Sequence, residues 1–318
     1  MNKSKKIFDE SKLPIAKYED SFFADKSYID SLPDMQNTHL ENSISTPLMQ
    51  VGMHNFKLPL KFLGKDCEVR ELEATVTGTV SLSANNKGIN MSRIIRTFYE
   101  FKDRIFTPDL LEEILNAFKR DQATSRAKIE ISFSYPILQK SLRSNLDGWQ
   151  YYKCSYSGFI DDLNRFRKIV SFDYVYSSAC PCSSELGEHA RNNRNLYCIP
   201  HSQRSKARVK LELEKNAHIT IEEIQQHCLN ALKTETQVMV KREDEQAFAE
   251  LNGAYVKFVE DAARLLHREF DSDIKIKDFE IACIHLESLH SHDAVSVVCK
   301  GRPGGFAGNF ANFSDLLC

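Results

Sequence analysis

"AKIEISFSYPI" (residues 127–137) and "WQYYKCSYSGFI" (149–160) are two strand patterns that follow each other with no helical pattern between them. In both stretches apolar and polar side chains alternate, which is typical of a β-strand that buries one face. Runs of adjacent strands favour antiparallel sheets with the helices gathered on one face. The pair therefore predicts an α+β fold.

The residues before this pair extend the same architecture. Apolar side chains recur at helical spacing over 91–102 and 107–120, where Thr107 is the expected N-cap and Pro108 the first helical residue. Strand-like alternation precedes both helices, over 54–63 and 67–84. The first half of the chain is thus predicted to have the order ββααββ.

The residues after the pair repeat this order. A helix is expected to open at Thr220, because Glu223 three residues later completes a capping box. A second helix is predicted over 254–270, and strands flank the two helices on both sides, over 166–178, 206–214, 274–287 and 293–299. The second half is therefore also predicted as ββααββ.

These patterns divide the chain into four parts. We expect tandem ββααββ units over 46–165 and 166–300, between an N-terminal extension (1–45) and a C-terminal tail (301–318). Open sheet edges are a liability unless they are paired, so such units could close into a barrel by edge pairing between the two halves or between subunits. A homo-oligomer, a dimer or a tetramer, is therefore expected.

Composition narrows the class of protein. The formal net charge of −2 over 318 residues provides no basic surface for nucleic acid. The sequence has no long apolar run for a membrane span and no apolar signal segment at its start. Nine irregularly spaced cysteines suit a reducing compartment better than a disulfide framework. We therefore expect a cytoplasmic globular protein that binds neither membrane nor nucleic acid.

Four short segments gather the side chains that could carry chemistry, and each lies at or between predicted element ends. They are "ACPC" (179–182), "HSQRS" (201–205), "KREDEQ" (241–246) and "HLESLHSHDA" (285–294). Cys, His and Glu together are ligands for Zn²⁺, and the carboxylate also suits Mn²⁺ or Fe²⁺. None of the segments has the spacing of a structural zinc module, so the residues alone leave metal binding open.

The same segments resemble the signature blocks of the type IB GTP cyclohydrolases, enzymes of the tunnelling-fold superfamily. The resemblance also includes "KFVED" (257–261), "KGINMSR" (87–93) and "VGMHNFKLPL" (51–60), and it covers roughly residues 46–300. It implies tandem ββααββ units that assemble into barrels, with active sites at subunit interfaces. It further implies metal-dependent hydrolysis of GTP to 7,8-dihydroneopterin triphosphate and formate, the first step of folate or pterin biosynthesis.

The resemblance also implies roles for particular residues. The divalent metal, Zn, Mn or Fe, would be held by Cys180, His201, Glu245 and His290. Guanine would be bound by Glu260, with Glu287 as a second carboxylate beside the purine, and the triphosphate by Arg204, Lys87 and Arg93. The catalytic set would be Cys180, Cys182, Glu287 and His292, where the metal activates water and Cys182 and His292 are candidates for moving protons.

Some alternatives stay open at this point. Cys182 is a second ligand, an acid/base thiol or only a loop residue. The insertion over 183–200 brings in His189, which competes with His201 for the ligand role, and Asn90 stands where the family usually has His. Rival functions are a cyclohydrolase that forms a cyclic phosphate, a nitrile reductase, and a non-catalytic purine-binding oligomer.

Overall fold

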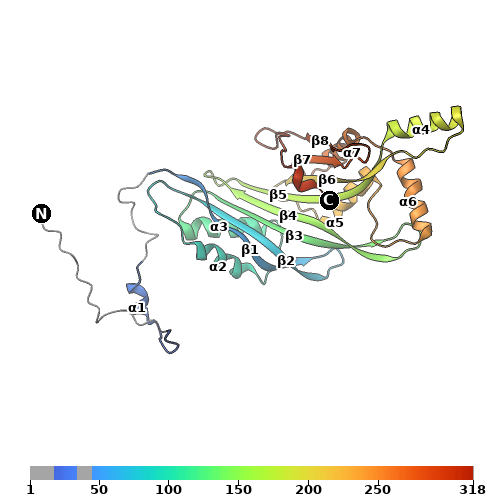
Figure 1. Cartoon of the computed structure of the whole chain (residues 1–318). Helices are drawn as coiled ribbons and strands as arrows, with labels where there is room; N and C mark the ends of the chain where they lie inside the picture. Colours follow the sequence, from blue (N-terminus) through green and yellow to red (C-terminus); the bar gives the residue numbers. More distant parts are fainter. Residues whose placement is uncertain (1–17, 34–44, 318) are drawn as a thin grey trace, which may run out of the picture.

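The computed structural model describes residues 18–33 and 45–317. In this part of the chain eight strands form one antiparallel sheet, in which each strand pairs with the next along the sequence from β1 to β8 (Figure 1). The strands are β1 (Leu48–Leu63), β2 (Val69–Leu82), β3 (Ala127–Lys140), β4 (Asp147–Ile160), β5 (Phe166–Ala179), β6 (Ser202–Leu213), β7 (Ile276–His285) and β8 (Ala294–Cys299). The predicted α+β class with an antiparallel sheet is confirmed.

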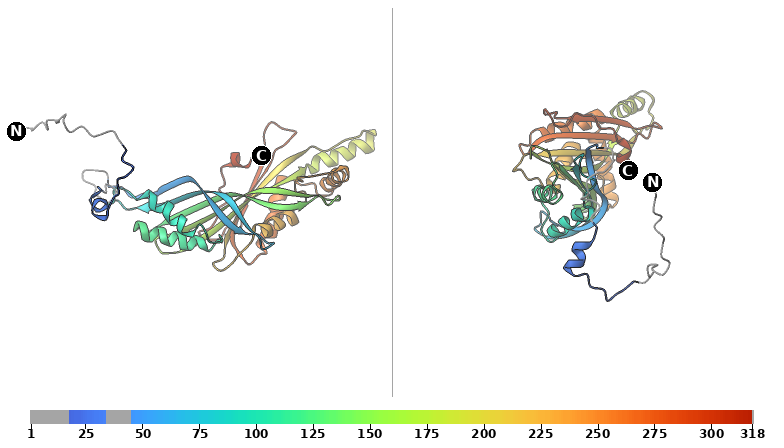
Figure 2. Two further views of the ribbon diagram at one scale, coloured as in Figure 1. Left: turned by 90° about the horizontal axis from the view of Figure 1, so that it is seen from below. Right: turned by 90° about the vertical axis from the view of Figure 1, so that its left-hand side faces the viewer.

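Some of the helices cover one face of this sheet, whereas the first helix and the fourth lie away from it (Figures 1 and 2). The helices are α1 (Lys26–Ser31), α2 (Met91–Phe101), α3 (Leu110–Gln122), α4 (Pro181–Arg194), α5 (Ile221–Leu232), α6 (Arg242–Ala254) and α7 (Val259–Asp271), with a 3₁₀ helix η2 (Phe313–Leu316) near the end. α2 and α3 pack on the strands of the first half, and α5 and α7 on those of the second. None of the helices in the described ranges is long and apolar enough to cross a membrane.

The sheet buries the side chains that its alternation predicts. Along β3 the alternate residues Ala127, Ile129 and Ile131 are buried under the helices, whereas Lys128 and Glu130 between them are not buried. Gly158 on β4 faces α3 so closely that an added Cβ would lie 2.9 Å from a methyl group of Leu115. Burial of these alternating side chains supplies the main hydrophobic contribution to the fold.

Two helix starts differ from the prediction, and a third agrees with it. α3 begins at Leu110 after Asp109, and not at Pro108. α7 begins at Val259 and not at 254, which is the last residue of α6. Phe258 before α7 is extended, and the Lys257 N–H donates to the Ala179 carbonyl over 3.1 Å. The capping box of Thr220 with Glu223 on α5 is confirmed.

Two further helices were missed altogether. The segments that hold α4 and α6 were expected to be loops, but each forms a regular helix of the second half. Their sequences are polar almost all round, with only Ala190 buried on α4 and only Asp244 and Ala247 on α6. An apolar stripe is the main sequence signal for a helix, so helices without one are missed. The strict ββααββ order therefore holds for the first half but not for the second.

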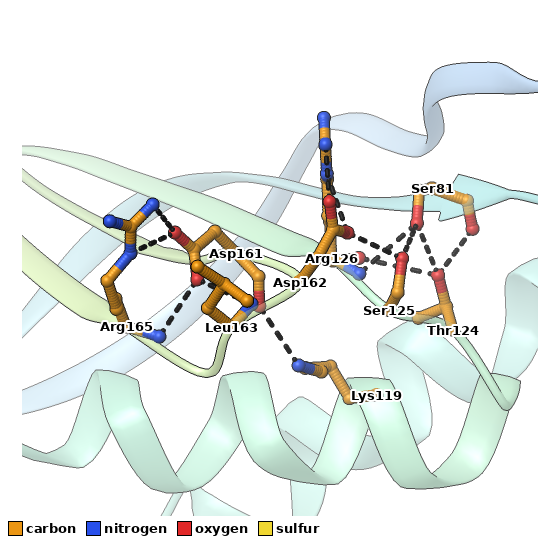
Figure 3. A network of polar contacts seen from close by, with 9 residues as sticks. All are labelled: Ser81, Lys119, Thr124, Ser125, Arg126, Asp161, Asp162, Leu163 and Arg165. Carbon is orange, nitrogen blue, oxygen red and sulfur yellow. Dashed lines mark hydrogen bonds and ion pairs between the residues drawn. The ribbon is translucent and has the colours of Figure 1, made fainter.

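Turns at the end of the sheet near α3 are joined by a polar network (Figure 3). The Arg126 guanidinium makes two bonds to the Asp162 carboxylate, one of them 2.7 Å long from Nε. Lys119 on α3 adds a second link, because its Nζ donates to the Asp161 carbonyl over 3.2 Å. The hydrogen bonds and charge of Arg126 lower the pKa of Asp162 to about 2. This network fixes the β4–β5 turn against the end of α3.

The C-terminal tail folds back onto the sheet on the side of η2. The buried Asp278 carboxylate accepts backbone N–H bonds from Gly301 (3.0 Å) and Phe306 (2.6 Å). Gly305 must be glycine here, because a Cβ would lie only 1.8 Å from an Asp278 oxygen. The expected tail over 301–318 is thus an ordered, docked segment through residue 317. Most of the expected N-terminal extension lies outside the described residues.

A buried carboxyl group joins β4 to the segment after α5. Glu235 accepts hydrogen bonds from the Tyr152 hydroxyl (2.7 Å) and from Gln225 Nε2 (2.8 Å). Burial, opposed only in part by these hydrogen bonds, raises the pKa of Glu235 to about 7. In the unfolded chain the same carboxyl titrates near pH ~4.3.

This difference predicts a pH-dependent stability. The folded state holds the Glu235 proton more tightly than the unfolded chain does. The protonated carboxyl therefore stabilises the fold fully below about pH 4, and this stabilisation is lost as the pH rises through about 7. A Glu235→Gln variant cannot ionise there. We expect its melting temperature, relative to that of the parent protein, to be higher at pH 8 than at pH 5. Parallel curves of melting temperature against pH would contradict this expectation.

Candidate active site

Two predicted ligands meet where β5 ends and β6 begins. The last residue of β5, Ala179, pairs with Ser202, the first residue of β6. One step beyond this pair, the Cys180 N–H donates to the His201 carbonyl over 3.1 Å. The strand register therefore places Cys180 and His201 next to each other, although many positions separate them along the chain.

The insertion between these two residues is α4 with its return loop. Cys180 is the N-cap of α4, and its Sγ accepts the Ser183 N–H at 3.5 Å. α4 projects beyond the end of the sheet (Figure 1), and it carries His189 on its exposed surface. Cys182 lies in the first turn of α4, exposed, and not in a loop. The structure thus brings His201, and not His189, beside Cys180.

The side chain of His201 faces two oxygen atoms. Its Nδ1 lies 3.1 Å from Gln203 Oε1 and 3.4 Å from an oxygen of the Glu287 carboxylate. Glu287 follows the end of β7, which pairs with β6, so the sheet also accounts for this approach. Both side chains of the His201–Glu287 pair are 15% exposed. Three strand ends therefore meet here: the backbone of Cys180 bonds that of His201, and the His201 and Glu287 side chains approach each other. Cys180, His201 and Glu287 are called the trio below.

Beneath this trio lies a buried polar cluster. Its members are Ser178, Gln203, Ser205, His285 and Tyr176, none more than 9% exposed. Ser178 Oγ lies 2.8 Å from Ser205 Oγ and 3.2 Å from His285 Nδ1, and the Tyr176 hydroxyl lies 2.9 Å from His285 Nε2. Burial, together with the charge of Lys257, lowers the pKa of His285 to about 4, so this imidazole is neutral at pH 7.

A cavity of about 780 Å³ adjoins the same strand ends. Arg204 of β6 and Glu245 from the first turn of α6 both line it. The sequence neighbours of Cys180 and His201, namely Ala179, Pro200 and Ser202, also line it, together with other residues of α6 and of the segment before α6. A volume between about 300 and 1,000 Å³ is typical of a small-molecule site. Two of the predicted side chains, Arg204 and Glu245, therefore share one cavity at this end of the sheet, and the residues of the trio are not among those that line it.

His290 and His292 lie on the turn between β7 and β8. Their rings stack with centroids 4.8 Å apart, and both side chains are exposed. The His290 N–H donates to the Glu287 carbonyl over 3.3 Å. The two imidazoles therefore share a turn with Glu287, but they face solvent.

The predicted purine and phosphate residues are divided between the two ends of the molecule. Glu260 lies exposed in the first turn of α7, whose start is tied to Ala179 through the Lys257 N–H. Arg93 lies in the first turn of α2 and Lys87 four residues before the helix, and Figure 1 shows α2 at the end of the sheet away from α4 and α6. Within one chain, the structure does not bring Lys87 and Arg93 to Cys180.

Comparison with known proteins places the chain in a family. The family described as "Type I GTP cyclohydrolase folE2" matches residues 32–296, which is most of the chain. The chain belongs to the type I GTP cyclohydrolase FolE2 family.

Curated relatives in this family are similar over nearly the same span. GTP cyclohydrolase FolE2 of Ruegeria sp. (strain TM1040) is 47% identical over 287 residues, which cover 89% of this chain and 78% of that protein. GTP cyclohydrolase FolE2 of Dinoroseobacter shibae is 49% identical over 288 residues, again 89% of this chain and 78% of that protein. Among solved structures, uricase from Arthrobacter globiformis aligns with a TM-score of 0.49 at 8% identity, covering 81% of this chain and 95% of that one.

The donor types gathered at the candidate site fit a divalent metal. Thiolate, imidazole and carboxylate are the ligands that Zn²⁺ takes in proteins, and carboxylate with imidazole also suits Mn²⁺ or Fe²⁺. Among the described residues no three His, Cys, Asp or Glu side chains are close enough to hold one ion. The metal shell of Cys180, His201, Glu245 and His290 stays a prediction.

Several residues that surround the candidate site were given no role in the sequence analysis, although Gln203 and His285 lie in two of the four quoted segments. Gln203, Ser178 and His285 lie within strands, where their polar side chains look like ordinary members of an alternating pattern. The alternation of each strand predicts which residues point inward, and a polar side chain at an inward position is the sequence signal that could have drawn attention to these three residues. Asp244 was passed over because it lies in a charged segment next to Glu245.

Asp244 connects α6 to the β3–β4 turn and so positions Glu245. Its fully buried carboxylate accepts bonds from the Arg143 N–H (2.8 Å), the Ser144 N–H (2.9 Å) and the Lys241 N–H (2.8 Å). Burial alone would raise the pKa of Asp244, but these bonds and one from the Ser144 hydroxyl hold the pKa well below its usual range.

This geometry predicts that Asp244→Asn destabilises the protein at pH 7. An amide can accept fewer of the four bonds, so we expect the melting temperature to fall by several degrees. The pKa of Asp244 is lower in the folded protein than in the unfolded chain, where it is about 4, so the ionised carboxylate stabilises the fold above that pH. This stabilisation is lost as the pH falls below about 4. The melting-temperature gap to the parent should therefore narrow below pH 4. A gap that stayed constant from pH 7 to pH 3 would contradict the role of the ionised carboxylate.

Proposed function

We propose that this protein hydrolyses GTP to 7,8-dihydroneopterin triphosphate and formate, with net consumption of one water, in folate biosynthesis. Membership of the FolE2 family supports the reaction. The observation that carries the proposal in the structure is that adjoining strand ends set Cys180 next to His201 through a backbone bond and bring the His201 and Glu287 side chains within 3.4 Å. A cavity of about 780 Å³, lined by Arg204 and Glu245, opens at the same end of β5 and β6.

In this proposal Cys180, His201, Glu245 and His290 hold a divalent metal, Zn, Mn or Fe. When bound, such an ion would lower the pKa of water and supply a nucleophile near neutral pH. Cys180 and His201 are already adjacent through their backbone bond. Glu245 approaches from the cavity wall and His290 from the turn that carries Glu287.

The chain's own side chains would bind and orient the substrate. Glu260 can accept two hydrogen bonds from guanine, at N1–H and at the 2-amino group. Arg204 lines the cavity and can pair with phosphate oxygens. Glu287 lies within the trio and can take a proton from, or return it to, the purine nitrogens as the imidazole ring opens. Cys182 and His292 are further candidates for moving protons, from the first turn of α4 and the β7–β8 turn.

We further infer a type IB, tunnelling-fold assembly of subunits, each built from units over 46–165 and 166–300, in the cytoplasm. The position of α2, at the end of the sheet away from α4 (Figure 1), supports an assembly, because Arg93 lies in α2 and Lys87 just before it. A second copy of the chain could bring them to the triphosphate. A homo-oligomer, a dimer or a tetramer, would then complete the site.

The decisive experiment is product analysis with metal-loaded protein. GTP should yield formate and a fluorescent pterin after oxidation, in equal amounts, and chelation should stop both. Formate with a cyclic phosphate product would select the cyclic-phosphate-forming reaction. Binding of GTP without turnover under Zn²⁺, Mn²⁺ and Fe²⁺ would refute the proposal and favour a non-catalytic purine-binding protein. Metal-independent covalent trapping of a nitrile would favour a nitrile reductase.

A further inference from the structure

The Gln203 side chain connects the candidate ligand His201 to the buried cluster beneath it. Its Oε1 lies 3.1 Å from His201 Nδ1, and its Nε2 donates to Ser178 Oγ over 2.8 Å. Gln203 is 9% exposed and Ser178 is fully buried. One neutral amide therefore spans the distance between a partly exposed imidazole and a closed polar interior.

The surroundings of His201 determine which ring nitrogen carries the proton. Nδ1 faces the Gln203 amide oxygen and, at 3.4 Å, an oxygen of the Glu287 carboxylate. A bare Nδ1 would point its lone pair at two oxygen lone pairs, which is repulsive. A protonated Nδ1 instead donates to them. The neutral ring is therefore the Nδ1–H tautomer, in which Nε2 keeps its lone pair.

The same reasoning fixes the orientation of the Gln203 amide. If the amide were turned round, its NH₂ group would face the His201 N–H, donor against donor. With the oxygen toward His201, the NH₂ group meets Ser178 Oγ, whose own contacts are Ser205 Oγ and His285 Nδ1. Ser178, Ser205 and His285 are all buried. The hydrogen bond from His201 to the Gln203 oxygen and the one from the Gln203 NH₂ group to Ser178 are thus made in the same amide orientation.

We propose that Gln203 is a positioning residue that holds His201 with its proton on Nδ1, so that Nε2 is free to bind a divalent cation. This inference rests on the metal-dependent function proposed above and deepens it. Metal-binding histidines almost always donate their second ring N–H to an oxygen, which sets the tautomer and the ring orientation. Because Gln203 is neutral and performs this task, the Glu287 carboxylate remains available to the substrate.

Two substitutions separate the accepting role of Gln203 from its packing. Gln203→Met and Gln203→Glu are close to Gln in size, and both remove the N–H bond to Ser178. Only Gln203→Glu keeps an oxygen acceptor for the His201 N–H, as in the carboxylate–histidine–metal arrangement. Ser205→Ala serves as a control, because it alters the buried cluster without touching His201. Thermal melts of all three variants establish whether they are folded.

The measurement is the Zn²⁺ dissociation constant of the full chain, from competition with a chromophoric chelator at pH 8. We expect Gln203→Met to bind Zn²⁺ about 10- to 100-fold more weakly, and Gln203→Glu and Ser205→Ala to stay within about threefold of the parent. The Co²⁺ absorption spectrum should change in Gln203→Met and not in Ser205→Ala. No GTP is used, so the outcome does not depend on turnover.

Three results would overturn the inference. Folded Gln203→Met could bind Zn²⁺ as tightly as the parent. Gln203→Glu could lose as much affinity as Gln203→Met, which would point to the Ser178 bond and not to the acceptor. Finally, the parent could bind no divalent metal, in which case a separate formate assay would show whether the GTP reaction itself survives.

Discussion

A Cys180→Ala variant should release formate from GTP at least ~10³-fold more slowly than the parent protein. Removing the thiol takes away one ligand of the proposed metal and the group at the N-terminus of α4. A bound metal contributes several kcal/mol to catalysis, and each ~1.4 kcal/mol corresponds to a factor of ten in rate. Bound Zn²⁺, measured after dialysis, should fall from near one per chain toward zero.

Cys198→Ala is the matched control for this prediction. Cys198 lies in the same inserted segment, beside Gly187 of α4, but it belongs to no predicted ligand set. Its replacement should leave both formate release and bound metal unchanged. If Cys180→Ala kept full activity and full metal content while folding normally, the metal site would have to lie elsewhere. The proposed reaction would then lose its main structural support.

The sheet was predictable because its signal is local. Alternation over 127–137 and 149–160 predicted β3 and β4, which span Ala127–Lys140 and Asp147–Ile160. Burial on one face of a strand imposes a two-residue period that sequence alone displays. The capping box of α5 was visible for the same reason, since both of its bonds join residues three apart.

The end of the sheet that carries the site was predictable only in part. Cys180 and His201 flank two strands that follow each other along the chain, so their meeting follows from antiparallel pairing. Glu245 lies on a helix that has no apolar stripe, and its position depends on the bonds of Asp244 to a turn 100 residues away. Contacts of that kind are set by tertiary packing, which no local pattern reports.

Polar residues inside the strands were the hardest to foresee. Gln203 and Ser205 alternate with Arg204 and Lys206, so "QRSK" looks polar throughout and does not reveal which face is buried. The pairing of β6 with β5 sets Gln203 opposite the buried Ser178, and this places the Gln203 side chain in the interior. The support for His201 is therefore a property of the folded sheet.

Glu260→Gln should abolish the preference for guanine. Inosine triphosphate lacks the 2-amino group of GTP but keeps N1–H, so the parent should favour GTP over it by about 10- to 150-fold in kcat/KM, the value of one charge-assisted hydrogen bond. In the variant, the new amide would present one oxygen and one NH₂ group to the two guanine donors. We expect kcat/KM for GTP to fall by about 10²- to 10⁴-fold and the ratio of GTP to inosine triphosphate to approach one.

The control for this prediction is Glu243→Gln, which changes an exposed carboxylate in the first turn of α6 instead of α7. It should leave both the rate and the nucleotide preference unchanged. If folded Glu260→Gln kept the parent's preference for GTP, guanine would have to be read by another group. Glu287, the second carboxylate beside the purine, would then be the residue to replace, because its side chain already lies 3.4 Å from His201. A preference that survived both substitutions would place guanine recognition outside these two carboxylates.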